Sequence, residues 1–373
     1  MKKITHLING LDSGGAETVL VRLILNDSQG NKHLVISLKD DGFYGKQLKE
    51  NGVTVKSLEL NKPHNVIFGI GIFKLLNLLR KNKTDTLIAW MPHSCLLGGL
   101  VGKICGIKKI IWNFRGASEN LNDNTKLHHI VLFTCKKLQK YIPNKIIVCA
   151  NYVNDVLGDY GFETSNIKVI FNGYDSNEYS INNKSRKEIR KELQVPKDTP
   201  LLGMIARWHP QKNHGLLIES LKLIKSRNLE FRCLLLGEGI QNELILESIS
   251  KLGMSDFFIL RNETKNIPAI LNALDIHILS SKFGEGFPNV IAEAMLCGTP
   301  CIATDIGDSE LIVGQTGWIS KNDSVSEMSD KIFKAIECWK DKKAWHNKSN
   351  EARNRIIKNF HISSMINNYQ NIY

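Results

Sequence analysis

The sequence predicts an α/β protein made of two domains, each a doubly wound parallel sheet. Its 373 residues exceed the usual size of one domain and suit two domains of roughly 180 residues. Short β-branched apolar runs alternate with longer segments of helical period, the rhythm of β-α-β units around a parallel sheet. A polar stretch at residues 172–187 interrupts this rhythm, and a second series follows it. The expected domains therefore cover residues 1–177 and 178–355.

Each series supplies its own strands and amphipathic helices. Residues 17–26, for example, place Val19, Leu20, Leu23 and Ile24 on one stripe, as a helix packed on a sheet requires. The expected strands lie at residues 4–8, 34–38, 53–58, 86–90, 110–114, 145–149, 168–171, 201–206, 232–236, 257–260, 276–279 and 301–303. Ligands bind beyond the carboxyl ends of parallel strands, so two such domains facing each other would form a central cleft.

Composition restricts the class of partner. Lysine and arginine total 49 against 37 acidic residues, and residues 1–177 hold 23 of these bases and 14 of these acids. Such an excess favours phosphorylated substrates, nucleic acid or an acidic membrane surface. No basic-aromatic recognition motif accompanies the charge, which argues against nucleic acid.

Three features favour the cytoplasm. The eight cysteines include no C-x-x-C pair and lie mostly in apolar runs, so buried free thiols in a reducing compartment are expected. Thr5 and His6 interrupt the first apolar run, which is typical of a strand rather than of a secretion signal. The longest apolar run, residues 66–73, is far shorter than the roughly 20 residues that span a bilayer. Any membrane contact would therefore be peripheral.

Two strand-to-helix loops have the composition of phosphate sites. Gly14 and Gly15 follow the first expected strand, where small residues and a helix N-terminus suit a phosphate; an ordinary tight turn is the alternative. The spacing lacks G-x-G-x-x-G, which argues against a dinucleotide cofactor. Arg207 and Lys212 follow the first strand of the second series. Two fixed cations there can neutralise a departing diphosphate, with solvated surface charge as the alternative.

The most informative segment is the Gly-rich loop after the expected strand at residues 276–279. Glu285 lies in this loop, and Glu293 lies on a helix that begins near Pro288 and ends at Gly298, as proline and glycine preferences at helix ends predict. The two carboxylates can accept hydrogen bonds from hydroxyl groups of the sugar and of the ribose of a sugar nucleotide. For Glu293, a solvated helix position is the alternative. Pro288 has no amide hydrogen, but its neighbours can meet phosphate or sugar oxygens through their amides. The expected substrate-binding residues are Gly286, Phe287, Pro288, Asn289, Val290 and Glu293.

In order and spacing, these motifs resemble the retaining, nucleotide-sugar-dependent glycosyltransferases of family 4, which have the GT-B fold of two Rossmann-like domains. The resemblance extends from Ile4 to Trp318. Each motif is modest, but the ordered set is specific. The matching motifs are Ser13-Gly14-Gly15-Ala16-Glu17, Arg207 with Lys212, Gly237-Glu238-Gly239, Glu285-Gly286-Phe287-Pro288-Asn289 with Glu293, and Thr304-Asp305-Ile306-Gly307.

The resemblance implies a role for each residue of these motifs. The Gly14-Gly15 loop would face the phosphates and the transferred sugar. Arg207 and Lys212 would bind the diphosphate, Glu285 the sugar hydroxyls, and Glu293 the ribose. The backbone near residues 260–262 would form part of the base pocket, with UDP expected and GDP as the alternative. Residues 356–373 would form a terminal helix that crosses back to the first domain.

One position departs from the family pattern. Many members place a histidine after the strand equivalent to residues 110–114, where it meets the transferred sugar, and this chain has Arg115 there. Arg115 either takes over that position or binds an anionic acceptor. His93 is a further candidate, with a structural loop histidine as the alternative.

The mechanism implied by the resemblance needs no metal and no cofactor besides the nucleotide-sugar substrate. The sequence contains no D-x-D motif, so Arg207, Lys212 and Glu285 are the expected catalytic residues. Retaining chemistry in the family is written as front-face attack, in which the departing phosphate accepts the proton of the acceptor hydroxyl. Alternative activities are a sugar-nucleotide epimerase and a non-catalytic sugar-nucleotide-binding protein.

The expected acceptor is a glycan or a polyprenyl-diphosphate-linked sugar in bacterial surface-polysaccharide synthesis, of the lipopolysaccharide or capsule type, bound mainly by the basic first domain. Residues 132–142 mix apolar and cationic side chains in a way compatible with a helix on anionic lipid. A core-packed helix with a solvated lysine face is the alternative. The sequence thus predicts a cytoplasmic protein that can lie on the inner face of the plasma membrane.

Overall fold

The chain folds into two units. The computed structural model describes residues 1–373 except 13, 61–68, 117–125, 263, 265 and 322. Unit 1 contains Met1–Gly173 together with Ile362–Tyr373, and unit 2 contains Tyr174–His361. The chain thus leaves unit 1 a few residues before the expected boundary at 177 and returns to it a few residues after 356.

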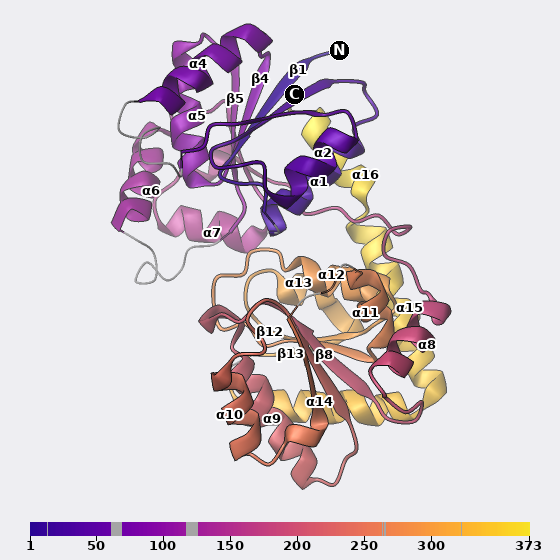
Figure 1. Cartoon of the computed structure of the whole chain (residues 1–373). Helices are drawn as coiled ribbons and strands as arrows, with labels where there is room; N and C mark the ends of the chain where they lie inside the picture. The colour runs from indigo at the N-terminus through magenta and orange to yellow at the C-terminus, as the bar shows by residue number, and fades with distance from the viewer. Residues whose placement is uncertain (13, 61–68, 117–125, 263, 265, 322) are drawn as a thin grey trace. The chain divides into compact units, whose positions relative to one another are not determined.

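Unit 1 is built on a seven-stranded parallel sheet (Figure 1). The strand order is β3-β2-β1-β4-β5-β6-β7, so the direction of winding reverses between β1 and β4. The strands are β1 (Lys3–Ile8), β2 (Lys32–Ser37), β3 (Thr54–Ser57), β4 (Thr86–Trp90), β5 (Lys109–Phe114), β6 (Lys145–Val148) and β7 (Ile167–Val169). In open sheets of this kind, ligands bind at such a reversal, beyond the carboxyl ends of the strands.

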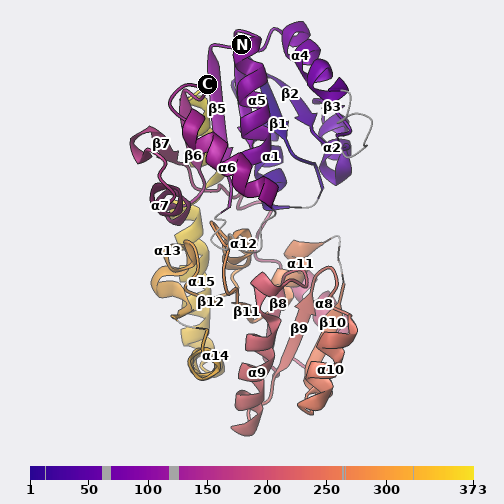
Figure 2. The ribbon, with the colours of Figure 1, turned by 90° about the vertical axis from the view of Figure 1, so that its left-hand side faces the viewer.

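Helices cover both faces of this sheet (Figures 1 and 2). They are α1 (Gly15–Leu25), α2 (Gly42–Glu50), α4 (Ile70–Asn82), α5 (Pro92–Ile104), α6 (Lys126–Leu138), α7 (Asn151–Asp159) and α16 (Ile362–Gln370). On one face, Leu20 of α1 and Tyr369 of α16 join a buried apolar cluster with strand residues such as Trp90. On the other face α5 lies close to the strands, because a Cβ atom at Gly98 would come within 2.7 Å of Leu7.

Unit 2 repeats the architecture with six parallel strands in the order β10-β9-β8-β11-β12-β13, reversing between β8 and β11. The strands are β8 (Leu201–Ile205), β9 (Arg232–Leu236), β10 (Phe258–Arg261), β11 (Ile276–Leu279), β12 (Cys301–Thr304) and β13 (Trp318–Ser320). The helices are α8 (Asn183–Glu192), α9 (His214–Ser226), α10 (Glu243–Lys251), α11 (Ile267–Ala273), α12 (Asn289–Leu296), α13 (Ser309–Val313), α14 (Val325–Lys340) and α15 (Lys342–Asn359). The predicted fold class, two doubly wound parallel-sheet units, is confirmed.

Helix α8 is a departure from the sequence pattern, since it begins inside the polar stretch expected to be a linker. Its one buried residue is Arg190, which is held by Asp275 at 2.9 Å. The same carboxylate accepts a hydrogen bond from the Leu201 amide at the start of β8. An ion pair therefore docks this helix, and hydrophobic periodicity gives no sign of it.

The cysteines and helices bear on two further expectations. All eight cysteines are free thiols, and six of them are buried. Within the described parts of the chain, no helix combines the length and apolar character needed to cross a membrane. The mixed apolar and basic segment at residues 132–142 is helical up to Leu138, the last residue of α6.

Candidate functional site

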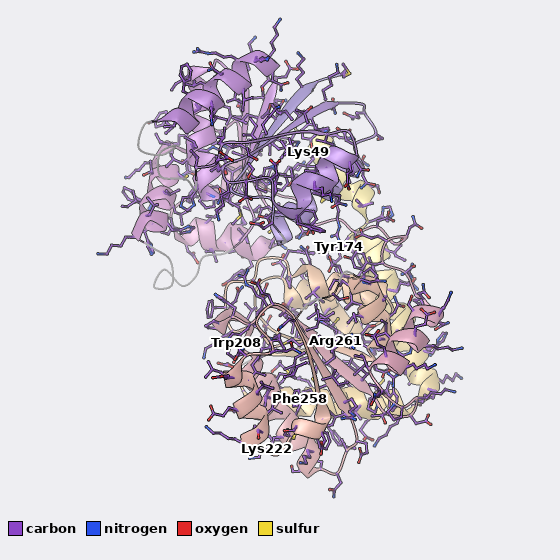
Figure 3. All side chains as sticks on the ribbon, viewed as in Figure 1. Lys49, Tyr174, Trp208, Lys222, Phe258 and Arg261 are labelled. Carbon is purple, nitrogen blue, oxygen red and sulfur yellow. The ribbon has the colours of Figure 1, made fainter. Side chains whose placement is uncertain are left out.

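The loop after β8 carries Arg207 and Lys212 at the point where the unit-2 sheet reverses. A short 3-10 turn, Pro210–Lys212, leads from this loop into α9. Figure 3 shows Trp208 of this loop and Arg261 of β10 at one end of the sheet, and Lys222 of α9 at the opposite end. Arg207 is exposed, and its guanidinium is therefore accessible to a ligand at the carboxyl ends of the strands.

The Gly237-Glu238-Gly239 motif supports this loop through its backbone. The Trp208 amide donates to the Glu238 carbonyl oxygen at 2.7 Å. A Cβ atom at position 237 would lie 2.1 Å from the Ala206 carbonyl oxygen, which is closer than any side chain allows. Glycine at 237 therefore permits the contact between the loops after β8 and β9.

Lys212 and Glu285 form an ion pair at the centre of the candidate site. Lys212 Nζ lies 2.5 Å from Glu285 Oε1, with side-chain exposures of 19% and 10%. The Ser281 hydroxyl donates to the same carboxylate oxygen at 2.6 Å. An ammonium group has three hydrogens to donate and a carboxylate has two acceptor oxygens. The pair can therefore stay together and still offer Lys212 to a phosphate and Glu285 to a sugar hydroxyl.

The loop after β11 is hydrogen-bonded at two positions to the loop after β8. The Lys282 amide donates to the Gln211 carbonyl oxygen at 2.7 Å, and the Ser280 hydroxyl lies 3.1 Å from the Lys212 carbonyl oxygen. These bonds join the loop that carries Glu285 to the loop that carries Lys212. These bonds hold the Lys212 and Glu285 side chains in place relative to one another.

The Thr304-Asp305-Ile306-Gly307 motif supports the Glu285 loop from the next strand. Thr304 Oγ1 donates to the Ser281 carbonyl oxygen at 2.5 Å, and the Asp308 amide donates to the Gly286 carbonyl oxygen at 2.9 Å. Gly307 has φ +63°, and a Cβ atom there would lie 2.6 Å from the Glu285 carbonyl oxygen. Glycine is therefore required at this position both by its conformation and by the close approach.

The residues that open α12 divide between structural and accessible positions. The Phe287 ring packs against the rings of Tyr174 and Phe360, with centroids 6.4 and 5.2 Å away. Asn289 accepts a hydrogen bond from the Tyr174 hydroxyl at 2.7 Å. The side chains of Phe287 and Asn289 thus fix the loop, so their contribution to ligand binding would come from the backbone.

The remaining predicted positions of this segment lie where the sequence places them, in the loop and on the helix. Pro288 directly precedes α12, Gly298 ends it with φ +74°, and Gly286 lies in the loop that holds Glu285. Val290 is half-buried and Glu293 is buried, with 9% of its surface exposed.

The motifs in the sequence did not predict two buried histidines, His214 and His277, which lie close enough to Lys212 for its charge to lower their pKa. Burial, followed by the charge of Lys212, lowers the pKa of His277 to about 3. Burial is also the main cause that brings the pKa of His214 to about 4. Both rings are therefore neutral at pH 7, and neither adds positive charge beside the ion pair. No sequence signal reveals them, since His277 lies between two isoleucines and His214 follows a polar loop.

In unit 1, Gly14 caps α1 and Gly15 is its first residue, while Ser13 of the same motif lies outside the described residues. A Cβ atom at position 14 would lie 2.3 Å from Glu17 Oε2, so glycine leaves room for this carboxyl group. Burial is the largest cause that raises the pKa of Glu17. The loop after β1 thus combines small residues with a half-buried acid at a helix N-terminus.

Arg115 is directed toward the C-terminal helix. It donates to the side-chain oxygen of Asn172 and to the Tyr369 hydroxyl at 3.4 Å, and it lies over the Trp90 ring. Asn113 also donates to the Tyr369 hydroxyl, at 2.7 Å. These contacts connect the end of β5 to α16 across more than 250 positions of sequence. Tyr369 therefore belongs to this end of unit 1, although nothing near it in the sequence indicates this.

The remaining candidates are His93, the end of β10 and any metal site. His93 is in the first turn of α5, partly buried and 5.5 Å from the His128 ring. Leu260 accepts a hydrogen bond from the Gln241 amide group, and Asn262 bonds to the same side chain. Among the described residues, no three His, Cys, Asp or Glu side chains are grouped so that they could hold a metal ion.

Comparisons with known proteins agree with this fold. Profiles of two protein families match the chain: Glycosyltransferase Family 4 over residues 13–178 and Glycosyl transferases group 1 over residues 185–354. The chain therefore belongs to the glycosyltransferases of this two-domain class, as the motif order predicted. One relative is the UDP-Gal:alpha-D-GlcNAc-diphosphoundecaprenol alpha-1,3-galactosyltransferase of Escherichia coli. It is 25% identical over 313 residues, which cover 81% of this chain and 78% of the relative.

Solved structures show the same GT-B fold. HepE from Anabaena in complex with UDP superimposes with a TM-score of 0.86 at 20% identity, over 99% of this chain and 98% of HepE. TarM superimposes with a TM-score of 0.76 at 16% identity, over 100% of this chain and 98% of TarM. The two units of this chain are therefore the two domains of a GT-B glycosyltransferase.

Proposed function

We propose that the protein is a retaining, metal-independent glycosyltransferase. In this proposal it moves a sugar from a UDP-sugar to a glycan or lipid-linked acceptor in bacterial surface-polysaccharide synthesis. The observation that carries the proposal is the Lys212–Glu285 pair, 2.5 Å apart, beside Arg207 at the reversal of the unit-2 sheet. It supplies cations for a diphosphate and a carboxylate for sugar hydroxyls at the place where this topology binds ligands.

The choice of donor is supported by the structural neighbours. HepE has been solved with UDP and with UDP-glucose, and the E. coli relative is named for a UDP-galactose donor. In this chain, Arg207 and Lys212 would neutralise the two phosphates, while Glu285 and Glu293 would accept hydrogen bonds from the sugar and the ribose. UDP is therefore our first expectation, and GDP is the alternative to test.

The proposed chemical step is front-face attack by the acceptor. The bond between the anomeric carbon and the phosphate oxygen breaks while a bond to the acceptor oxygen forms on the same face. The acceptor proton passes to the departing phosphate oxygen. Arg207 and Lys212 stabilise the negative charge that develops on the diphosphate, a type of electrostatic stabilisation that contributes about 3 to 4 kcal/mol for each donor group.

The acceptor is proposed from the relatives' chemistry. The E. coli relative acts on a diphosphoundecaprenol-linked sugar, and so does a Campylobacter jejuni relative that is 24% identical over 205 residues. A polyprenyl-diphosphate acceptor is embedded in a bilayer. The proposal therefore includes a cytoplasmic protein that lies on the inner face of the membrane, in keeping with its free and largely buried thiols.

The decisive experiment is acceptor-dependent transfer. UDP-sugars and GDP-sugars would be screened by thermal shift, since a ligand that binds only the folded state raises the melting temperature. Transfer of the stabilising sugar to a polyprenyl-diphosphate-linked acceptor would then be followed by NMR of the anomeric centre. Retained configuration with nucleotide release only when acceptor is present supports the proposal. An inverted product contradicts the retaining mechanism, and conversion of the sugar nucleotide without acceptor indicates an epimerase.

A further inference from the structure

One face of unit 1 has an unusual surface. Helices α4, α5 and α6 lie on the same side of the sheet, and Figure 2 views them from that side. Contacts between α4 and α5 and between α5 and α6 join the three helices into one layer. We name their outward side chains the three-helix face. Its members are Ile72, Phe73, Lys74, Leu100, Lys103, Ile104, Lys126, Leu127, Ile130, Phe133 and Lys137.

The three-helix face exposes large apolar side chains. On α6, Leu127 and Ile130 are each 61% exposed and Phe133 is 50% exposed. These positions recur every three residues and thus share one stripe of the helix. On α4 and α5, the most exposed apolar side chains are Phe73 at 66% and Ile104 at 65%. Seven of the seventeen exposed large hydrophobic side chains of the described chain lie on these three helices, and such clustering marks an interaction surface.

The opposite side of α6 is packed in the ordinary way. Val131, Leu132 and Cys135 are buried, so the helix already has the apolar stripe that holds it to the sheet. The exposed apolar stripe is therefore a second one. A core-packed helix with only lysines on its outer side does not describe this surface.

Charge identifies the kind of partner. The three helices have thirteen residues each and contain seven lysines and arginines but no aspartate or glutamate. At the chain's average composition, a stretch of this length would hold about four acids. Cationic residues around inserted apolar side chains are the signature of a surface that binds acidic lipid.

We propose that the three-helix face docks unit 1 on an anionic lipid bilayer. Phe73, Ile104, Ile130 and the other apolar side chains would enter the headgroup region, and the surrounding lysines would contact acidic headgroups. This proposal rests on the proposed function in one respect, because a membrane-embedded acceptor makes such docking useful. The exposed apolar residues of α6 lie between its second and eighth residues, toward its N-terminal end. That end of α6 follows the carboxyl end of β5, where Arg115 lies and where an acceptor would have to arrive.

The first experiment measures binding to phosphatidylcholine vesicles with and without phosphatidylglycerol. The full chain is expected to sediment with the acidic vesicles and to be released by rising salt, which screens the lysines. The double variant Ile130→Asp and Phe133→Asp should bind at least tenfold more weakly, because two apolar side chains no longer enter the lipid. The matched control is Leu244→Asp with Leu246→Asp on α10, where the side chains are 65% and 49% exposed. The control should bind as the unchanged protein does.

The second experiment tests charge. Lys74→Glu, Lys103→Glu and Lys137→Glu together should weaken binding about a hundredfold, since each lysine near acidic lipid changes partitioning about fivefold. Lys222→Glu, Lys334→Glu and Lys343→Glu change three exposed lysines of unit 2 and should have a far smaller effect. Because all these side chains are exposed, the variants are expected to keep the melting temperature of the unchanged protein.

Each contrary result has a clear meaning. No binding of the unchanged protein to acidic vesicles at low salt would overturn the proposal, and so would equal weakening by the face variants and their controls. If the protein is a dimer that the Ile130→Asp and Phe133→Asp variant dissociates, and lipid does not bind, the face serves a second copy of the chain instead. The UDP-dependent rise in melting temperature and transfer to a water-soluble short-chain acceptor are measured in parallel. They test the proposed function independently, because the face variants should leave both unchanged.

Discussion

The strand order of each sheet reverses once, yet the charged side chains at the carboxyl ends of the two sheets are held in different ways. In unit 2, the loops after β8 and β11 bring Lys212 within 2.5 Å of Glu285. In unit 1, the side chain after β5 is a cation too, but Arg115 is bonded to Asn172 and Tyr369. Topology therefore decides where a ligand can bind, and the local side chains decide which chemistry is available there.

The difference arises from the hydrogen-bond partners at the strand ends of each unit. The unit-2 loops bond to one another, through Lys282 to Gln211 and Thr304 to Ser281, so their charged side chains can serve a ligand. In unit 1, polar groups at the end of β5, one strand away from the reversal between β1 and β4, hold a helix from the far end of the chain. Unit 1 is then expected to meet the substrate mainly through the small residues of the Gly14-Gly15 loop.

The largest effect is expected from Arg207→Ala. Loss of this cation should lower kcat by about two to three orders of magnitude, since one preorganised donor contributes about 3 to 4 kcal/mol to the transition state. The melting temperature should stay within the error of the measurement because Arg207 is exposed. The control is Arg227→Ala, which removes an exposed arginine paired with Asp330 at the C-terminal end of α9. Normal turnover of Arg207→Ala would show that unit 2 does not use this cation.

Gly307→Ala tests whether the loop behind Glu285 positions that residue. A Cβ atom at this residue would lie 2.6 Å from the Glu285 carbonyl oxygen, at φ +63°, so strain and a clash act together and should cost about 1 to 3 kcal/mol. Transfer should fall at least tenfold. Gly253→Ala is the matched control, with φ +64° and nothing within 4 Å of the added atom. It carries the same strain without the clash, and equal loss of transfer in both variants would contradict the positioning role.

Tyr369→Phe tests the contact between β5 and α16 in unit 1. Removing the hydroxyl leaves the buried Asn113 amide without its acceptor, which should lower the free energy of unfolding by about 1 to 3 kcal/mol. The thermal shift produced by UDP should be unchanged because the proposed nucleotide site lies in unit 2. Tyr373→Phe serves as the control, since its hydroxyl is buried and has no hydrogen-bond partner among the described residues. Equal stability of the two variants in urea denaturation would contradict our account of α16.

A further effect concerns the dependence of stability on pH. The pKa of His277 is lowered to about 3 in the folded protein, so the unfolded chain binds a proton first as the pH falls. The free energy of unfolding should therefore decrease below pH about 6.5, by about 1.4 kcal/mol per pH unit for this histidine. The variant His277→Gln should remove that part of the slope between pH about 6.5 and about 4.5. The free energy of unfolding would be measured by urea denaturation at several pH values. Parallel plots of that free energy against pH for the two proteins would contradict the buried, neutral state of the ring.

Much of the fold was predictable because its signals are local. Runs such as 86–90 and 276–279 became buried strands, β4 and β11, with bounds that match the expected ones. The expected helix at 17–26 is α1, and Gly298 ends α12 as expected. Helix α8 was not predicted, because its contact with the sheet is an Arg190–Asp275 ion pair between residues far apart in the sequence.

The candidate site also has parts that local sequence predicts and parts that depend on distant segments. Residue type and spacing predicted Arg207, Lys212 and Glu285 as candidates, since cations after one strand and a Gly-rich acidic loop after another are visible in the sequence. Three features were not visible in the sequence. They are the packing of Phe287 against two aromatic rings, the hydrogen bond of Arg115 to α16, and the neutral histidines near Lys212. Each depends on a neighbour supplied by a distant segment.

By itself, the sequence determined the α/β class, the two-unit order and the residue types at the strand ends, because hydrophobic period and turn chemistry act over a few residues. The tertiary structure alone decided which charged groups pair, which rings lose their protons, and which apolar side chains of α6 face outward. Those outcomes depend on distances and solvent exclusion between segments far apart in the chain, and hydrophobic period and motif spacing do not encode them.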